Sequence, residues 1–581
     1  MIRAVFVLGV LAAHLCAQAP ARDALSHREQ GKLLLASGEF DQAITEFHAA
    51  LTLDPRSYEI HNYLGVCWVG KKDLDTAVRK FREALRLNPG YVEARSNLGA
   101  ALLRTGNLRA AEAELRLAAD EAPSSPEVHY RLGLALSSAG NQHGALSALQ
   151  RAVVLKPDFG QALNDLGVVL VMLGELDGAE ARFRQAADAD PGYGEARYNL
   201  GRVLLRKGES RSAIAEFREA IFADRGHVGA RVQLGGALLV EGDTENAVRE
   251  LQEAIRLDPN NADAHFQLGL ALRAREDRKN AIAEFQKAIA LNPGSVQARN
   301  ALGAAWAEMA KLEEAIREFR AALRLEPDGF DGRYNLGLAL LMSSEVDLAL
   351  VELQAAAKLR PEEAKVHYRL GSALTKAGDV DRAIAAYRTT LQLDPDYPGA
   401  HYNLGRVFNR KGDRKKAAEE FKVVADLQRQ QEARDAAETR VLLYIGRGLK
   451  AMAGGDIEGA VREFRSAVRS GPNSAEAHNH LGVSLARTGD IDGAIAEFRK
   501  AIELEPKQSP AYNNLGGLLA ATSGMESAIT QFEEAVRLQS DFAEAHYNLG
   551  VMLLRRGERE RAKLEFQKAR ELNPKLEPPE Y

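Results

Sequence analysis

Small and apolar residues recur along this chain three and four positions apart, in segments separated by short polar turns. This spacing places them on one face of an α-helix, so the pattern predicts a succession of amphipathic helices. The same pattern returns every 34 residues, and a glycine marks each return. The marking glycines are Gly31, Gly65, Gly99, Gly133, Gly167, Gly201, Gly235, Gly269, Gly303, Gly337, Gly371 and Gly405, and, after one step of 43 residues, Gly448, Gly482, Gly516 and Gly550. The chain therefore contains sixteen repeated units, twelve and then four.

Each unit predicts two helices joined by a tight turn. With the marking glycine as position 8, positions 4, 7, 8 and 11 form one helical face and positions 20, 24, 27 and 28 form another. Position 20 is Ala in every unit, and position 24 is Phe, Tyr or Leu. The small residues at positions 8 and 20 let the two helices approach closely. Position 15 is usually Gly, and an acidic or amide residue usually follows it, so the first helix ends there and the second begins.

The 34-residue step, Gly at position 8, Ala at position 20 and Pro at position 32 of thirteen units together resemble the tetratricopeptide repeat. The resemblance covers residues 24–576. It implies an all-α fold, a right-handed α-solenoid (superhelix) of stacked helix-turn-helix hairpins. It also implies that the first helix of each unit lines a concave groove, with positions 2, 5, 6, 9, 12 and 13 toward the interior.

Departures from the pattern mark the ends of two arrays. Position 7 is Leu in fourteen units, and the exceptions are Gln30 in the first unit and Arg447 in the thirteenth. We expect twelve repeats at residues 24–431, a helical spacer at 432–440, four repeats at 441–576 and a tail at 577–581. No Gly or Pro interrupts the chain from Asp413 to Ile445, which predicts one extended helix across the spacer. The spacer is either a hinge or an insertion without functional motion.

The first nineteen residues have the layout of a secretory signal peptide. Arg3 precedes an apolar run that ends at Leu15, and Ala17 and Ala19 supply the small residues that signal peptidase requires. Cleavage after either alanine fits this layout. Cys16 raises a lipoprotein alternative, which Leu15 disfavours because a small residue is needed before the modified cysteine. We expect an exported protein, periplasmic, envelope-associated or secreted, without an integral membrane segment once residues 1–19 are removed.

Composition and motifs exclude several classes of function. Lys and Arg number 76 against 81 Asp and Glu, and a net charge of −5 opposes a nucleic-acid partner. No phosphate loop, nucleophile elbow or zinc-protease motif occurs, and two cysteines cannot build a disulfide framework. Most histidines share position 4, which makes them packing residues: His27, His61, His129, His265, His367, His401, His478 and His546. We therefore expect no catalytic residue, no cofactor and no metal site.

The candidate binding residues lie on the predicted groove. Position 6 is often Asn, and a row of amides can pair with an extended peptide backbone of any sequence, because each amide both donates and accepts. The row comprises Asn97, Asn199, Asn335, Asn403, Asn514 and Asn548. It is similar to the asparagine ladder in the repeats of O-linked N-acetylglucosamine transferases. Asparagine at this position also occurs in ordinary repeats of the family, so a ladder and a generic residue both remain open.

Two units add arginine pairs beside this row. The sequence Tyr-Asn-Leu-Gly at 198–201 is followed by Arg202 and Arg206, and the same sequence at 402–405 by Arg406 and Arg410. Arginines four residues apart share a helical face and could grip a carboxylate of a partner. Solvated surface charge is the alternative.

These features favour a non-catalytic scaffold that binds protein or peptide partners in its concave groove. The alternative is a substrate-recruiting repeat protein related to O-linked N-acetylglucosamine transferases. We do not expect a catalytic domain in this chain, because the repeats occupy nearly all of it and a catalytic domain needs more than a hundred residues.

Overall fold

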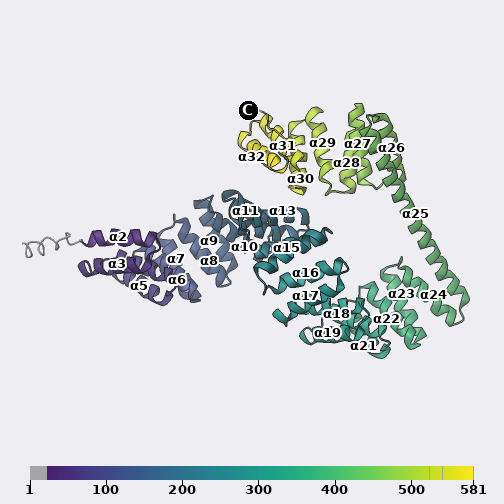
Figure 1. The fold of residues 1–581 in the computed structure, drawn as a ribbon, viewed down its shortest axis with the longest axis horizontal. Helices are drawn as coiled ribbons and strands as arrows, with labels where there is room; N and C mark the ends of the chain where they lie inside the picture. Colours follow the sequence, from purple (N-terminus) through teal and green to yellow (C-terminus); the bar gives the residue numbers. More distant parts are fainter. Residues whose placement is uncertain (1–22, 523, 540, 580–581) are drawn as a thin grey trace, which may run out of the picture. The chain divides into compact units, whose positions relative to one another are not determined.

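The computed structural model describes residues 23–522, 524–539 and 541–579, and these residues form α-helices and turns without a β-strand. The all-α prediction is confirmed, and successive helices pair into hairpins (Figure 1). The chain divides into two compact units, one ending at Val203 and one from Leu204 onward, with a border inside α12. The predicted signal segment, residues 1–19, lies outside the described residues.

Each predicted repeat is a hairpin of a first and a second helix. The first helices are α2 (Ala24–Ala36), α4 (Tyr58–Gly70), α6 (Val92–Arg104), α8 (Pro126–Ser138), α10 (Gly160–Leu173), α12 (Gly194–Arg206), α14 (Val228–Val240), α16 (Ala262–Ala274), α18 (Val296–Glu308), α20 (Phe330–Met342), α22 (Ala364–Ala377), α24 (Pro398–Arg410), α27 (Ala475–Thr488), α29 (Ser509–Thr522) and α31 (Ala543–Arg556). The second helices are α3 (Phe40–Leu53), α5 (Leu74–Leu87), α7 (Leu108–Glu121), α9 (Gln142–Leu155), α11 (Leu176–Ala189), α13 (Ser210–Ala223), α15 (Thr244–Leu257), α17 (Arg278–Leu291), α19 (Leu312–Leu325), α21 (Val346–Leu359), α23 (Val380–Leu393), α26 (Ile457–Ser470), α28 (Ile491–Leu504), α30 (Met525–Leu538) and α32 (Arg559–Leu572).

The small residues of each hairpin lie where its two helices touch. In the hairpin of α16 and α17, a Cβ added at Gly269 would lie 2.5 Å from Cε1 of Phe285, which is far inside van der Waals contact. Phe285 and Ala281 are both fully buried. Glycine at position 8 thus leaves room for the aromatic ring at position 24, as the sequence pattern predicts.

Wherever the structure describes position 15, the turn inside the hairpin has a left-handed residue there. Gly106 has a φ of +78°, and the amide of Asn107 donates to the carbonyl of Leu102 at 2.9 Å, which closes the end of α6. Four hairpins adopt the same turn without glycine, at Lys72, Glu276, Ala310 and Ser344, whose φ values lie between 58° and 68°.

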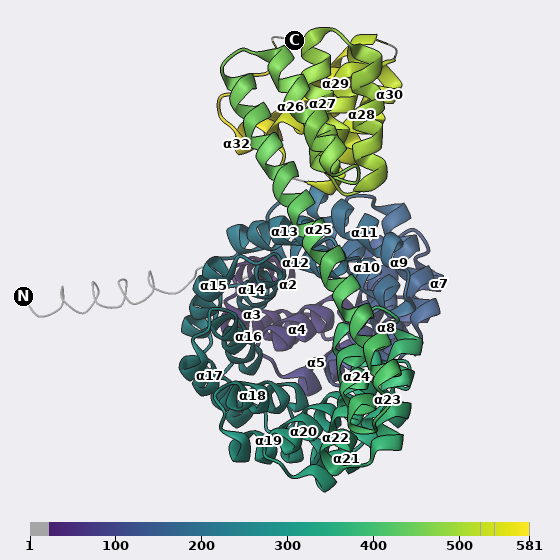
Figure 2. The same ribbon diagram turned by 90° about the vertical axis from the view of Figure 1, so that its right-hand side faces the viewer.

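One helix, α25 (Arg414–Ala453), replaces two (Figure 2). It serves as the second helix of the twelfth hairpin, packing on α24, and as the first helix of the thirteenth, packing on α26. Residues 428–436 between these two ends are all exposed. The extended helix predicted across the spacer is therefore present, while the division into arrays at 431/432 and 440/441 stays a prediction. No described helix, α25 included, has the length and apolarity needed to cross a membrane.

Successive hairpins stack with their first helices closest together. Among the described helices, α6 contacts α8 and α16 contacts α18, whereas second helices do not reach the second helices of neighbouring hairpins. Each stack therefore curves toward its first helices, and the exposed face of those helices is its inner side. We call this surface the first-helix face.

Candidate binding face

The six predicted asparagines of position 6 lie on the first-helix face, and all but Asn335 are bonded to the preceding hairpin. In each case the side-chain nitrogen donates to the residue at position 5 of the hairpin before. The pairs are Asn97 to Asn62 at 3.0 Å, Asn199 to Asn164 at 3.0 Å, Asn403 to the Tyr368 hydroxyl at 3.2 Å, Asn514 to Asn479 at 3.0 Å and Asn548 to Asn513 at 2.9 Å. The asparagines therefore form part of the contact between neighbouring hairpins. The sequence pattern missed this role because the acceptors occupy a different position of the repeat.

These bonds leave each amide with further capacity. A primary amide has two N–H donors and two lone pairs on its oxygen, and the bond to the preceding hairpin uses one donor. At Asn97 the oxygen is also engaged, because Nη1 of Arg131 donates to it at 2.9 Å. Asn335 is half-buried and makes no hydrogen bond with any described residue. The row can thus stabilise the stack and still present donors and acceptors to a peptide.

Asp165 stands at position 6, where half of the units have an amide. The Tyr130 hydroxyl donates to Oδ2 of Asp165 at 2.9 Å, and Nδ2 of Asn164 donates to Oδ1 at 3.2 Å. Burial raises the pKa of the Asp165 carboxyl, although these two hydrogen bonds act against the rise. The protein therefore holds a carboxylate at this point of the row at some cost in stability.

The predicted arginines are exposed on the same face. The guanidinium of Arg202 lies 5.6 Å from the centroid of the Tyr198 ring, and that of Arg406 lies 5.8 Å from the Tyr402 ring. Arg206 and Arg410 follow one turn later on α12 and α24, and both are exposed. None of the four arginines forms an ion pair with another described residue. They are therefore available to a partner.

The position-4 histidines have a structural role. In nine described hairpins a His or Arg at position 4 pairs with a Glu at position 23 of the second helix. The pairs are His27–Glu46, Arg95–Glu114, Arg231–Glu250, His265–Glu284, Arg299–Glu318, Arg333–Glu352, His401–Glu420, His478–Glu497 and His546–Glu565, at 2.5 to 3.2 Å. Within the described part of the chain no three His, Cys, Asp or Glu residues are grouped to hold a metal ion.

The hairpin of α4 and α5 is one of those that lack this pair. His61 has Lys80 at position 23 in place of glutamate, and Nδ1 of His61 is buried without a hydrogen-bond partner. Burial lowers the pKa of His61, and the nearby Lys80 lowers it further.

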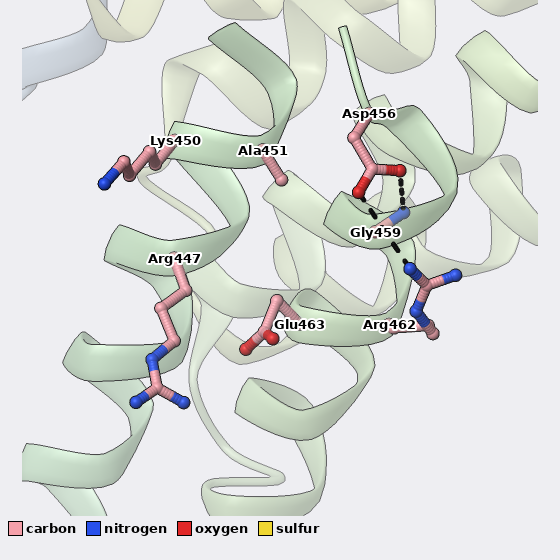
Figure 3. Close-up of a pocket in the computed structure, with 7 residues that line it drawn as sticks. All are labelled: Arg447, Lys450, Ala451, Asp456, Gly459, Arg462 and Glu463. Atoms are coloured by element: carbon pink, nitrogen blue, oxygen red, sulfur yellow. Dashed lines mark hydrogen bonds and ion pairs between the residues drawn. The ribbon is translucent and has the colours of Figure 1, made fainter. Parts of the chain in front are cut away.

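A shallow cavity of about 320 Å³ lies at the first of the last four hairpins (Figure 3). Arg447 and Lys450 line it from α25, and Glu463 lines it from α26. Oε2 of Glu463 is buried without a hydrogen-bond partner, because position 4 of this hairpin is Tyr444 and carries no charge. Asp456, also in the lining, accepts from the amide of Gly459 at 2.7 Å and so caps α26. The Asp456 carboxylate is therefore occupied in capping α26.

Comparison with known families gives one consistent result. Models described as "Tetratricopeptide repeat" match residues 28–92, 130–194, 173–228 and 445–511, residues 69–133, and residues 262–295 and 543–576. A model described as "TPR repeat" matches residues 235–274, 308–344, 371–412 and 525–557. No curated protein sequence matches the chain.

Several solved structures are similar to parts of the chain. MamA from Desulfovibrio magneticus RS-1 is 28% identical, covering 29% of this chain and 96% of its own, with a TM-score of 0.29. YrrB, described as a TPR protein with an unusual peptide-binding site, is 25% identical, covering 32% of this chain and 95% of its own, with a TM-score of 0.28. The Cut9–Hcn1 assembly is 14% identical, covering 91% of this chain and 96% of its own, with a TM-score of 0.34.

Proposed function

Because this chain belongs to the tetratricopeptide repeat family, we propose that it is a non-catalytic scaffold that binds an extended segment of a partner protein on its first-helix face. The observation that supports this proposal is the row of side chains at positions 5 and 6. Successive first helices carry it from hairpin to hairpin, and its amides keep donors and acceptors beyond the bonds that join the hairpins. A peptide backbone carries alternating donors and acceptors, which such a row can meet.

The arginines provide the direct test. We expect the full chain with Arg202, Arg206, Arg406 and Arg410 all changed to Glu to lose partner proteins that the unchanged chain retains from an extract, as identified by mass spectrometry. Both proteins must show the same helical circular dichroism. The matched control changes four exposed basic residues of second helices and α25 to Glu: Arg218, Arg388, Lys415 and Lys422. If the control loses the same partners, the first-helix face is not the binding surface.

We also propose that the protein works outside the cytoplasm. The support is the layout of residues 1–19, with its basic start, apolar run and small residues near Ala17 and Ala19. A fusion of residues 1–24 to a reporter should be exported and cut between Ala17 and Pro20. Retention of the uncut reporter in the cytoplasm would remove this part of the proposal.

A further inference from the structure

Two neighbouring first helices, α22 and α24, carry basic residues and no acidic ones. Lys365, Arg369 and Lys376 lie on α22, Arg406 and Arg410 lie on α24, and neither helix contains Asp or Glu. The whole chain has a net charge of −5, so this concentration of positive charge is a local feature. The surface formed by these five residues is called the basic patch below.

Contacts along the row place the basic patch on the first-helix face. Nζ of Lys376 donates to the carbonyl of Leu341 in the preceding first helix at 3.0 Å. Lys365 lies 5.7 Å from the ring centroid of Tyr334, which is also in that helix. Arg406 and Arg410 stand one and two turns after Tyr402 on α24 and share its face. The five cations thus point to the same side as the row of asparagines at position 6.

Tyrosines lie between these cations. Tyr334, Tyr368 and Tyr402 occupy position 5 of three consecutive hairpins. Arg369 lies 5.2 Å from the centroid of the Tyr368 ring, and Arg406 lies 5.8 Å from that of Tyr402. An arginine held over an aromatic ring keeps its edge N–H groups for a carboxylate. The stacked rings therefore orient the guanidinium groups without neutralising them.

Acidic residues engage little of this charge. Glu363, in the turn before α22, lies 3.5 Å from Lys365, and Asp331 is the acid of the preceding first helix. Arg406 and Arg410 form no ion pair with any described residue, and Arg369 and Lys376 form none either. Four of the five cations are thus without a counter-charge from the described protein.

We propose that the basic patch binds an extended segment of a partner protein that is rich in Asp and Glu. This inference rests on the proposed function and specifies the partner's chemistry at one place on the same face. A polypeptide fits better than a nucleic acid, because the adjoining first helix α20 carries Asp331 and exposes Met342, which is 58% accessible. A phosphate backbone continuing along the row would meet acidic and apolar side chains there. A peptide in which an acidic stretch is followed by an apolar or neutral one avoids this conflict.

The test uses the full chain and two fluorescein-labelled peptides, one alternating Glu with Ser and the other alternating Gln with Ser. We expect the Glu peptide to bind more tightly by fluorescence anisotropy, with an affinity that falls as salt is raised from about 50 to about 500 mM. Changing Lys376, Arg406 and Arg410 together to Glu should weaken its binding about tenfold or more, since three ion pairs become repulsions. The same three positions changed to Gln provide a milder variant in case the Glu set disturbs the fold.

The control variant reverses Arg388, Lys415 and Lys422, which changes the net charge equally on other surfaces and should leave binding unchanged. Equal binding of the Glu and Gln peptides would overturn the acidic-partner inference while leaving the proposed function intact. Failure of both peptides to bind would also overturn the inference. Variants with Asn→Ala at position 6 would then test the proposed function separately. A single-stranded oligothymidylate that displaces the Glu peptide at lower concentration than unlabelled Glu peptide would assign the patch to nucleic acid instead.

Discussion

Nδ1 of His401 lies 2.6 Å from Oε2 of Glu420, and Nε2 of the same ring lies 2.9 Å from the carbonyl oxygen of Pro395. One side chain thereby joins α24, α25 and the end of the preceding hairpin. Arg299 makes the corresponding contacts, with Glu318 at 3.2 Å and with the carbonyl of Pro293 at 3.3 Å. In these hairpins the residue at position 4 therefore connects the hairpin to the one before it.

The hairpin of α4 and α5 lacks the pairing of His401 with Glu420, and supplying a glutamate should stabilise it. Lys80→Glu gives His61 the partner that His401 has, so we expect slower hydrogen exchange in α4 and α5 and a local stabilisation of about 1 kcal/mol. In the present protein the pKa of His61 is lowered, by burial first and by Lys80 second. A lowered histidine pKa costs stability as the pH falls through the value of the unfolded chain. Lys80→Glu should therefore help most at and below about pH 6.5.

Lys80→Ala is the control for this prediction. It removes the positive charge without supplying an acceptor, so it should give a smaller gain than Lys80→Glu. Equal exchange rates in the two variants would show that the carboxylate does not pair with His61.

Ala310 occupies a turn position that favours glycine. Its φ is +58°, a conformation that costs an L-residue about 1–2 kcal/mol, whereas glycine loses about 0.5–1 kcal/mol of additional chain entropy on folding. We therefore expect Ala310→Gly to stabilise the hairpin of α18 and α19 by about 0.5–1 kcal/mol, measured by hydrogen exchange. Gly106→Ala places alanine in the same conformation, at a φ of +78°, and should destabilise α6 and α7. A change of the same sign in both variants would contradict the argument.

We expect the protein to become more stable when the charge of Asp165 is removed. Its pKa is raised by burial, so the folded protein disfavours the carboxylate. This cost grows as the pH rises from the pKa of the unfolded chain through that of the folded one. We expect Asp165→Asn to slow hydrogen exchange in α10 at pH 7 and to make little difference at pH 3. Equal effects at both pH values would show that the charge is not responsible.

The thiol of Cys67 should react only after unfolding. It is fully buried, and burial raises its pKa to about 11. At pH 8 the thiolate fraction is then about a thousandth, and the thiolate is the reactive form. We expect negligible reaction with Ellman's reagent in the native protein carrying Cys16→Ser, which leaves Cys67 as its one thiol, and prompt reaction in guanidinium chloride. Rapid labelling without denaturant would show that α4 opens readily.

The periodicity of the sequence predicts the hairpins, because residues that contact within one repeat are also constant from repeat to repeat. Gly269 and Phe285 are such a pair, and their contact follows from the pattern itself. The bonds between repeats do not follow from it. They join position 6 to position 5 of the preceding hairpin, and position 4 to the carbonyl of the proline at position 32 of that hairpin, so their geometry depends on how hairpins stack.

The basic patch could have been predicted from the sequence. Counting charges helix by helix shows that residues 364–377 and 398–410 contain no acid, whereas the search for motifs singled out Arg406 and Arg410 alone. That Arg369 lies over the ring of Tyr368 required the structure, since adjacent residues on a helix usually point in different directions.

The amide row serves both stability and binding, and Asn335 separates the two roles. Asn403 donates to Tyr368, so Asn403→Ala should cost about 0.5–1.5 kcal/mol of local stability whatever it does to binding. Asn335 makes no hydrogen bond with any described residue, so Asn335→Ala should leave hydrogen exchange in α20 unchanged.

If the row meets a peptide backbone, Asn335→Ala should weaken partner binding by roughly two- to tenfold through the loss of one hydrogen bond. Adding Asn97→Ala, Asn199→Ala and Asn403→Ala should weaken it further, because distant sites contribute nearly independently. Unchanged affinity in Asn335→Ala together with a loss in Asn403→Ala that tracks its instability would assign the row to stacking alone.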